Sequence, residues 1–219
     1  RASARRSHSR DALLLAALPH VAFDGWTDSA LLAGAVDAGL EPADVLRFFP
    51  GGACEAVGAF SIWADRQMIE AVAGADLSTL RHSEKIAFAV RVRLESLEPY
   101  REAVRRSIGF LALVPNVPAG LHMLYCSVDE MWYAVGDLSA DFSFYTKRAL
   151  LAGVVSTTTL YWLDDESDRR ADSWAFLDRR LADVLKIPQL GRRAESLLLR
   201  LPNPFRLLQL ARDRRRRPA

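Results

Sequence analysis

The sequence CSVDEMWYAVGDLSADFSFYTKRALLAGVVSTTTLYWLDD, residues 126–165, contains the features that decide the fold class. Apolar residues recur at helical spacing on both sides of Gly136, whereas the alternation typical of a half-buried strand is absent. Gly136 is suited to end a helix, and the chain can then start a second helix near Asp141. This stretch therefore predicts two consecutive helices, over residues 119–136 and 141–163.

Helical patterns continue from this stretch in both directions, and the segments between them are short. With these two included, we expect helices over residues 10–18, 27–40, 42–49, 53–73, 83–97, 100–113, 119–136, 141–163, 170–185 and 191–212. About ten helices with short connections predict an all-α bundle. We divide the chain into a flexible basic N-terminus (1–9), a helical domain (10–189) and a C-terminal segment (190–219).

The front of the chain has the proportions of a helix-turn-helix unit followed by a longer bundle, the layout of TetR-type regulators. Sequence-specific DNA binding is therefore an alternative to test. The would-be recognition helix, EPADVLRFFP, holds one cation, Arg47, beside Glu41 and Asp44. Because DNA affinity depends on neutralised phosphates and base contacts, this composition argues against nucleic acid as a partner. A basic arm of Arg1, Arg5, Arg6 and Arg10 keeps the repressor hypothesis open.

The longest uncharged run covers residues 107–128 and is long enough to raise the question of a membrane span. Pro115, Asn116 and Pro118 interrupt its middle, where a spanning helix needs unbroken backbone hydrogen bonds. We therefore expect two buried helices joined at VPNVP, and no transmembrane segment.

Residue patterns typical of catalysis are not found in the sequence. The four histidines are scattered, and none forms the Glu-x-x-His pairs of a di-iron bundle. No zinc-protease, nucleophile-elbow or phosphate-loop motif is present. The acidic residues Asp164, Asp165, Glu166 and Asp168 match no calcium loop, so we interpret them as a solvated, helix-capping connection. We expect no catalytic residue, no metal site and no cofactor.

A dense set of positions in residues 126–165 resembles the signature of the coenzyme Q biosynthesis accessory proteins, the family numbered ninth in the Coq series. The matching positions are Val128-Asp129, Met131-Trp132, Gly136-Asp137, Ser139, Asp141-Phe142 and Phe144-Tyr145-Thr146-Lys147-Arg148. The resemblance extends upstream through GWTDSALLAGAVDAGL and downstream through DSWAFLDRRL, and so covers most of the chain.

This resemblance implies a TetR-like fold that has lost its DNA-reading face, and a protein that is not an enzyme. It also implies a homodimer that binds isoprenoid lipid or phospholipid in a hydrophobic chamber. Such a protein presents quinone precursors to the di-iron hydroxylase of demethoxyubiquinone. One position departs from the pattern, because mitochondrial members commonly have Trp where this chain has Phe144. Phe144 cannot make a contact that needs an indole N–H, whereas burial of the ring is retained.

Aromatic and charged side chains gather in the signature segment, and two interpretations of them remain open. The rings either fill the core or form an exposed patch for a partner. Phe144 and Tyr145 are adjacent on a helix and point about 100° apart, so they cannot both face one core seam. We expect the partner site to comprise Asp129, Met131, Asp141, Phe144, Tyr145 and Arg148. We expect the lipid to contact Trp132, Phe142, Phe144 and Tyr145.

The C-terminus combines an apolar face with positive charge. From Arg192 to Ala219 nine arginines face only Glu195 and Asp213, a local net charge of +7 in a chain whose net charge is +2. Such a segment can lie in a membrane interface, although docking on the body is the alternative. We expect membrane contacts from Leu197, Leu198, Leu201, Phe205, Leu208, Arg193, Arg200 and Arg206. Pro202 and Pro204 interrupt this face. The expected location is the cytoplasmic face of a bacterial inner membrane, or the matrix side of the mitochondrial inner membrane.

Overall fold

The computed structural model describes residues 2–136 and 143–198, and every regular element within those ranges is a helix. The α-helices are α1 (Ala2–Asp24), α2 (Asp28–Asp37), α3 (Pro42–Phe48), α4 (Gly52–Gly74), α5 (His82–Ser96), α6 (Arg101–Leu111), α7 (Val117–Ala134), α8 (Ser143–Asp164) and α9 (Ala171–Leu198). Short 3-10 turns precede α6, α7 and α9, namely η1 (Glu98–Tyr100), η2 (Val114–Asn116) and η3 (Asp168–Arg170). The predicted all-α class is confirmed.

Local sequence signals place the ends of the front helices. The Thr27 hydroxyl accepts a hydrogen bond from the backbone N–H of Ala30 at 3.2 Å, so Thr27 is the N-cap of α2. Gly39 follows this helix with φ of +65°, a left-handed conformation that glycine adopts without steric cost. Pro42 occupies the first turn of α3, where its missing N–H is harmless.

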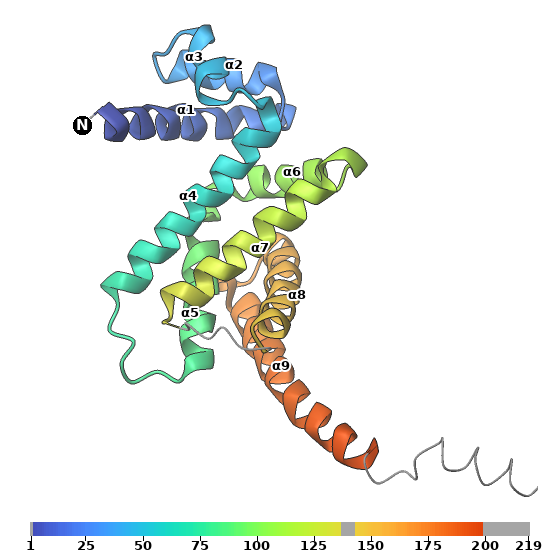
Figure 1. The fold of residues 1–219 in the computed structure, drawn as a ribbon. Helices are drawn as coiled ribbons and strands as arrows, with labels where there is room; N and C mark the ends of the chain where they lie inside the picture. Colours follow the sequence, from blue (N-terminus) through green and yellow to red (C-terminus); the bar gives the residue numbers. More distant parts are fainter. Residues whose placement is uncertain (1, 137–142, 199–219) are drawn as a thin grey trace, which may run out of the picture. The chain divides into compact units, whose positions relative to one another are not determined.

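The first three helices pack against one another at the N-terminal end of the fold (Figure 1). Leu13, Leu14, Leu18 and Leu31 are fully buried between α1 and α2. A Cβ added at Gly34 would lie only 2.5 Å from the Cα of Ala17, so glycine permits the close approach of these helices. Helix α1 begins at Ala2, earlier than the predicted start at residue 10, because Ala and Arg favour helix and neither Gly nor Pro precedes Pro19. The expected flexibility of residues 1–9 stays a prediction.

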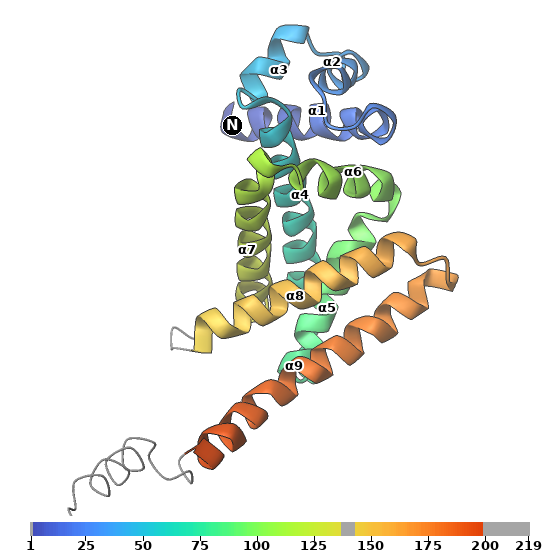
Figure 2. The ribbon, with the colours of Figure 1, turned by 90° about the vertical axis from the view of Figure 1, so that its right-hand side faces the viewer.

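The body that follows is built around α4, which packs against both α5 and α7 (Figure 2). An aromatic cluster of Trp26, Phe60, Trp63 and Tyr100 connects the front helices to this body. Within it, the indole N–H of Trp26 donates to the Ser107 hydroxyl at 2.8 Å. This buried hydrogen bond ties the loop before α2 to α6.

The chain bends at VPNVP, as predicted, and α6 and α7 form a sharp corner there. In the part of the chain that the structure describes, no individual helix is long and apolar enough to cross a bilayer. Residues 98–111 and 114–134 reach that composition only as a pair bent by 96°. Our expectation that both helices are buried is wrong at the corner, because Leu113, Val114 and Leu121 are largely exposed. These side chains project from the turn instead of packing between helices.

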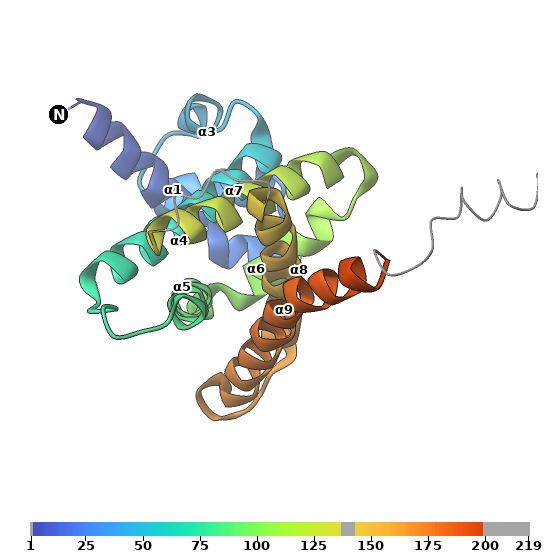
Figure 3. The ribbon, with the colours of Figure 1, turned by 60° about the horizontal axis from the view of Figure 1, so that its bottom comes forward.

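The last helices of the fold are α8, which packs beside α7 (Figure 3), and α9. The chain forms two compact units, residues 1–178 and 179–219, so the expected boundary near residue 190 falls inside the second unit. We predicted separate helices over 170–185 and 191–212, but α9 runs through Pro188 to Leu198. A proline inside a helix removes one hydrogen bond and can bend the helix without ending it.

Candidate functional site

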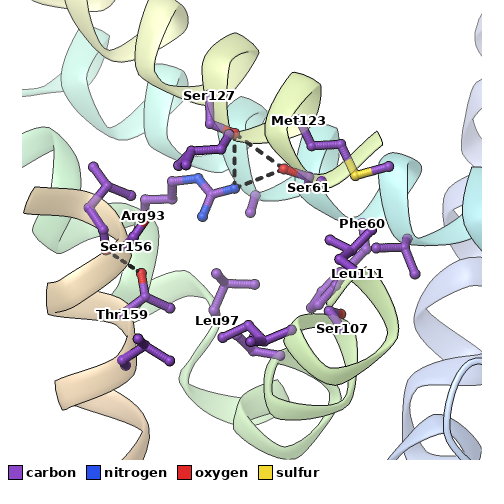
Figure 4. A pocket seen from close by; sticks show the side chains of 18 residues that line it. Phe60, Ser61, Arg93, Leu97, Ser107, Leu111, Met123, Ser127, Ser156 and Thr159 are labelled. Carbon is purple, nitrogen blue, oxygen red and sulfur yellow. Dashed lines mark hydrogen bonds between the residues drawn. The ribbon is translucent and has the colours of Figure 1, made fainter. Parts of the chain in front are cut away.

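A cavity of about 270 Å³ lies inside the first unit, between α4, α5, α6, α7 and α8 (Figure 4). Its wall is mostly hydrocarbon. The lining residues are Val57, Phe60, Ser61, Ala64, Arg93, Leu97, Val104, Ser107, Ile108, Leu111, Gly120, Met123, Leu124, Ser127, Val155, Ser156, Thr159 and Leu160. A mostly apolar cavity with a few convergent polar groups is typical of a small-molecule site.

The helices supply these side chains from faces whose residues recur at helical spacing. On α4, Val57, Ser61 and Ala64 follow intervals of four and three residues and so share one face. On α8, Val155 and Thr159 are likewise four residues apart. Small side chains such as Ala64 and Ser61 leave space that larger residues would fill. The cavity therefore results from small residues placed where helices meet.

One wall of the cavity holds a hydrogen-bonded ion pair between Arg93 of α5 and Asp65 of α4. The Arg93 Nε donates to Asp65 Oδ1 at 2.6 Å. Its Nη2 donates to the Ser61 and Ser127 hydroxyls at 3.1 and 3.3 Å. Ser127 in turn donates to the other Asp65 oxygen at 2.8 Å. Figure 4 shows Arg93, Ser61 and Ser127 converging on this wall.

Burial makes this cluster sensitive to the loss of any member. The side chains of Arg93 and Asp65 are only 12% and 8% exposed. Ions removed from water are stable only when their charge and hydrogen bonds are matched. The cluster meets that condition by joining α4, α5 and α7 through one network. It holds the three helices in fixed positions and places one cation against an apolar cavity.

No local pattern in the sequence identifies this cluster. Arg93 and Asp65 are separated by 28 positions, and no short motif connects them. The available signal was a charged residue on an otherwise apolar helix face, as Asp65 is between Ala64 and Met68 of α4. Such a residue is normally paired when buried, but the sequence alone does not name the partner.

Two of the residues predicted for a partner site form an ion pair with each other. Arg148 of α8 donates from Nε to the Asp129 carboxylate of α7 at 2.6 Å. The Arg148 side chain is 6% exposed, whereas that of Asp129 is 41% exposed. Arg148 is thus held inside the fold, and only Asp129 of the pair offers substantial surface to a partner.

The assignment of Met131 to the partner site is wrong. Its side chain is fully buried in the core formed by the helices. Spacing explains the error, because Met131 lies four residues after Ser127 and three after Val128, two other buried positions of α7. A side chain with no exposed surface cannot touch a partner without opening the fold.

Trp132 lies outside the cavity, so its predicted lipid contact is not part of this site. Its ring stacks on His82 with centroids 5.3 Å apart, and the Lys147 Nζ lies 5.8 Å from the ring centroid. The indole Nε1 is buried and has no hydrogen-bond partner among the described residues. Trp132 therefore packs between α5 and α8 at the opposite end of α7 from the α6–α7 corner.

For the other residues that we predicted from the signature, the structure describes only the backbone or does not describe the residue. Asp141 and Phe142 are outside the described residues, and Phe144 and Tyr145 are described only as backbone of α8. The same is true of the membrane assignment. Arg193, Leu197 and Leu198 lie on the backbone of α9, and Arg200, Leu201, Phe205, Arg206 and Leu208 are outside the described residues.

The acidic loop between α8 and α9 is a capping structure, as predicted, but it is not wholly solvated. Asp165 is buried and accepts hydrogen bonds from the backbone N–H groups of Ser167 and Ser173, both at 2.8 Å. Burial would raise the pKa of this carboxyl, but the Ser167 and Ser173 hydrogen bonds outweigh it and lower the pKa well below its ordinary value. Among the residues with described side chains, no cluster of three or more His, Cys, Asp or Glu could hold a metal.

The helix-turn-helix region offers little to DNA. On α3, Arg47 lies 3.5 Å from Asp44 and stacks over Phe48, so its charge is partly neutralised. Arg10, which we considered for a basic arm, donates to Glu55 at 2.9 Å and to the backbone carbonyl of Phe48. Arg10 therefore has a structural role at the start of α4, whereas the Arg47 side chain is 64% exposed and is the one described cation of α3.

Comparison with known proteins gives a consistent family relationship. Residues 117–188 match the family model named COQ9. The chain is 35% identical over 191 residues to "Ubiquinone biosynthesis protein COQ9, mitochondrial" of Rattus norvegicus, covering 84% of this chain and 61% of that protein. The equivalent protein of Homo sapiens is 34% identical, with 84% and 60% covered. The chain thus spans about 60% of the length of these relatives.

A solved structure confirms the fold independently. The crystal structure of a TetR transcriptional regulator from Nitrosomonas europaea superimposes with a TM-score of 0.65. The superposition covers 80% of this chain and 97% of the regulator, at 19% sequence identity. The predicted TetR-like arrangement is therefore correct. At this identity the similarity concerns the fold alone.

Proposed function

We propose that this chain, which carries a COQ9 match at residues 117–188 and is homologous to COQ9 proteins over most of its length, serves ubiquinone biosynthesis by binding an isoprenoid lipid. The observation that carries the proposal is the apolar cavity, because some of its lining residues belong to the matched segment. When a lipid tail or a quinone ring fills the cavity, apolar surface is removed from water, and this burial favours binding. The protein acts without a catalytic residue of its own.

The partner in this proposal is the di-iron hydroxylase of demethoxyubiquinone, to which the protein presents its cargo as a homodimer. Support comes from the names of the relatives, which place those proteins in ubiquinone biosynthesis. The partially exposed Asp129 carboxylate, fixed by Arg148, is a suitable anchor on the surface of α7 and α8. Asp141, Phe144 and Tyr145 remain predicted partner contacts.

The proposed location is the surface of the membrane that holds ubiquinone. The names of the relatives describe mitochondrial proteins, which supports a mitochondrial location, and within it we propose the matrix side of the inner membrane. In a bacterium the equivalent surface is the cytoplasmic face of the inner membrane. The cation-rich C-terminal segment supplies attraction to anionic lipid there, at about 1 kcal/mol for each Arg near the surface.

Filling the cavity tests the proposal. Ser156 lines the cavity, whereas the neighbouring Thr157 is exposed on the same helix. Ser156→Phe should place a ring inside the cavity and reduce the amount of lipid that co-purifies with the native protein. Thr157→Phe adds the same ring to the surface and should leave the bound lipid unchanged. Mass spectrometry of organic extracts from both variants and the parent measures the difference.

A lipid-free parent protein would contradict the proposal, provided that ubiquinone also failed to raise its midpoint of thermal unfolding. Ligands that bind only the folded state stabilise it by RT ln(1 + [L]/Kd), so the midpoint rises with the logarithm of ligand concentration once the concentration exceeds Kd. Equal lipid content in the two Phe variants would show that lipid binds elsewhere. Circular dichroism confirms that each variant retains its helices.

A further inference from the structure

The Arg93 guanidinium is held through only two of its three nitrogens. Asp65 engages Nε, and Ser61 and Ser127 engage Nη2. The third nitrogen, Nη1, makes no hydrogen bond within the described part of the chain. In Figure 4 it points away from the two serines, toward the space between Arg93, Leu97 and Thr159. Arg93 is itself one of the residues that line the cavity.

A second polar group faces the same cavity from α8. Ser156 lines it, and its hydroxyl has no hydrogen-bond partner among the residues whose side chains are described. Donors without partners in an apolar environment are unfavourable, and a ligand oxygen removes that penalty. The Nη1 donor is also preorganised, because three side chains fix the plane of the guanidinium. The cavity thus presents a fixed donor to whatever occupies it.

The charge of the cluster restricts the kind of oxygen that fits. Asp65 lies 2.6 Å from Arg93 and neutralises it, so the pair adds no net charge to the cavity. An anionic phosphate would enter this apolar space with an uncompensated charge, which is strongly unfavourable. A neutral carbonyl, hydroxyl or methoxy oxygen accepts the hydrogen bond without that penalty.

We infer that Arg93 selects the head of the bound lipid, with Nη1 donating to a neutral oxygen on a ring and the apolar wall holding the first part of its tail. The inference rests on the proposed function, since it concerns the same cavity. A cavity of about 150 Å³ can hold a benzene ring. At about 270 Å³ this one accommodates a substituted ring and a short tail. A longer isoprenoid must leave the cavity.

The test compares three probes that share a tail of two isoprene units. The ubiquinone with this tail offers ring oxygens, geranylbenzene offers the ring without oxygens, and geranyl phosphate offers a charged head. Delipidated full-length protein should bind the ubiquinone about tenfold or more tightly than either of the others, the discrimination expected for one charge-assisted hydrogen bond. Calorimetry or quenching of tryptophan fluorescence measures the three Kd values.

Arg93→Lys removes Nη1 while leaving a cation for Asp65. It should weaken ubiquinone binding about tenfold and change geranylbenzene binding by less than about twofold. Arg91→Lys is the matched control, because Arg91 lies on the same helix, pairs with Glu95 on the surface and does not line the cavity. If Arg93→Lys does not fold, Arg93→Met with Asp65→Asn removes both charges and is measured in its place.

The outcomes separate this inference from the proposed function. Ubiquinone and geranylbenzene binding equally, with no effect of the Arg93 change, would overturn the inference and leave a lipid cavity that ignores the head. Preference for geranyl phosphate would also overturn it and indicate a charged head. Failure of all three probes to bind would contradict the proposed function together with the inference.

Discussion

At the scale of single residues, Met131 distinguishes a core position from a partner contact. It is fully buried, whereas Tyr133 of the same helix is 64% exposed. Met131→Ala should lower the free energy of unfolding by about 2–5 kcal/mol, because it removes buried methylenes and leaves a cavity. Tyr133→Ala should change it by less than about 0.5 kcal/mol. Urea denaturation measures the free energy of unfolding of both variants. Equal stability of the two would contradict the burial of Met131.

Asp165 gives a prediction about pH. Its pKa is lower in the folded chain than the value of about 3.9 in an unfolded chain, because Ser167 and Ser173 hydrogen-bond the carboxylate. A carboxyl whose pKa is lower in the folded chain stabilises the fold at any pH above its unfolded-state pKa. This stabilisation is lost as the pH falls toward the pKa in the folded state. Asp165→Asn should therefore cost about 1–3 kcal/mol at pH 7.

The same substitution should cost about 1 kcal/mol less at pH 3 than at pH 7, because pH 3 lies about one unit below the unfolded pKa and each unit removes about 1.4 kcal/mol of the stabilisation. Parallel urea titrations of the parent and Asp165→Asn at pH 7 and pH 3 measure the difference. Asp164→Asn, at an exposed neighbour, is the control. A penalty that stays constant across this range would mean that hydrogen bonds to the carboxylate do not depend on its charge.

Single residues also mark where sequence reasoning reached its limit. Thr27, Gly39 and Pro42 could be assigned because a cap or a turn depends on near neighbours in the chain. Arg93 and Asp65 could not be paired, since their contact depends on how α4 and α5 pack. Met131 was misassigned because its neighbours in the signature are mixed in character. The signature thus indicated the similarity to COQ9 proteins but not the cavity.

At the scale of helices, the sequence predicted their number and order better than their ends. The bend at VPNVP was predictable because Pro115 and Pro118 oppose a continuous helix. Pro19 and Pro188 gave the wrong ends, since packing or a bend tolerates one missing backbone hydrogen bond. Local residue types indicate where a helix can end, but tertiary packing determines whether it ends there.

Two glycines offer a test of helix-level energetics. Gly39 adopts φ of +65° after α2, so Gly39→Ala should destabilise the protein by about 1–2 kcal/mol. Gly109 is exposed within α6, and a Cβ there would meet no atom within 4 Å. Gly109→Ala should therefore stabilise by about 0.4–1 kcal/mol. Thermal unfolding of both variants checks these signs, and stabilisation by Gly39→Ala would contradict the left-handed turn.

At the scale of the whole molecule, the residues that line the cavity and the residues of the signature are distributed differently along the sequence. The lining residues come from five helices between Val57 and Leu160, whereas most signature positions lie between Val128 and Arg148. The two sets of residues meet in the sequence at Ser127, which lines the cavity and directly precedes the signature. Helix α7 therefore carries both cavity-lining residues and Asp129 of the predicted partner site.

The C-terminal segment carries the last prediction, which separates membrane binding from DNA binding. Leu197, Leu198, Leu201, Phe205 and Leu208 are each worth about 1.5–3 kcal/mol when fully buried, so they must find lipid, protein or the body of the fold. Deleting residues 191–219 should leave a folded protein that no longer floats with anionic liposomes. Reversing the charges of Arg193, Arg200 and Arg206 should weaken flotation and reduce its sensitivity to salt.

A repressor would behave differently, because its DNA affinity would lie in residues 10–50 and survive the deletion. Flotation and DNA binding measured on the same truncated protein therefore give opposite results under the two hypotheses. Neutral liposomes provide the control, since they keep the apolar contribution and remove the attraction to arginine. Unchanged flotation of the truncated protein would move the membrane contact to the body, where the exposed Leu113, Val114 and Leu121 of the α6–α7 corner are the apolar surface to mutate next.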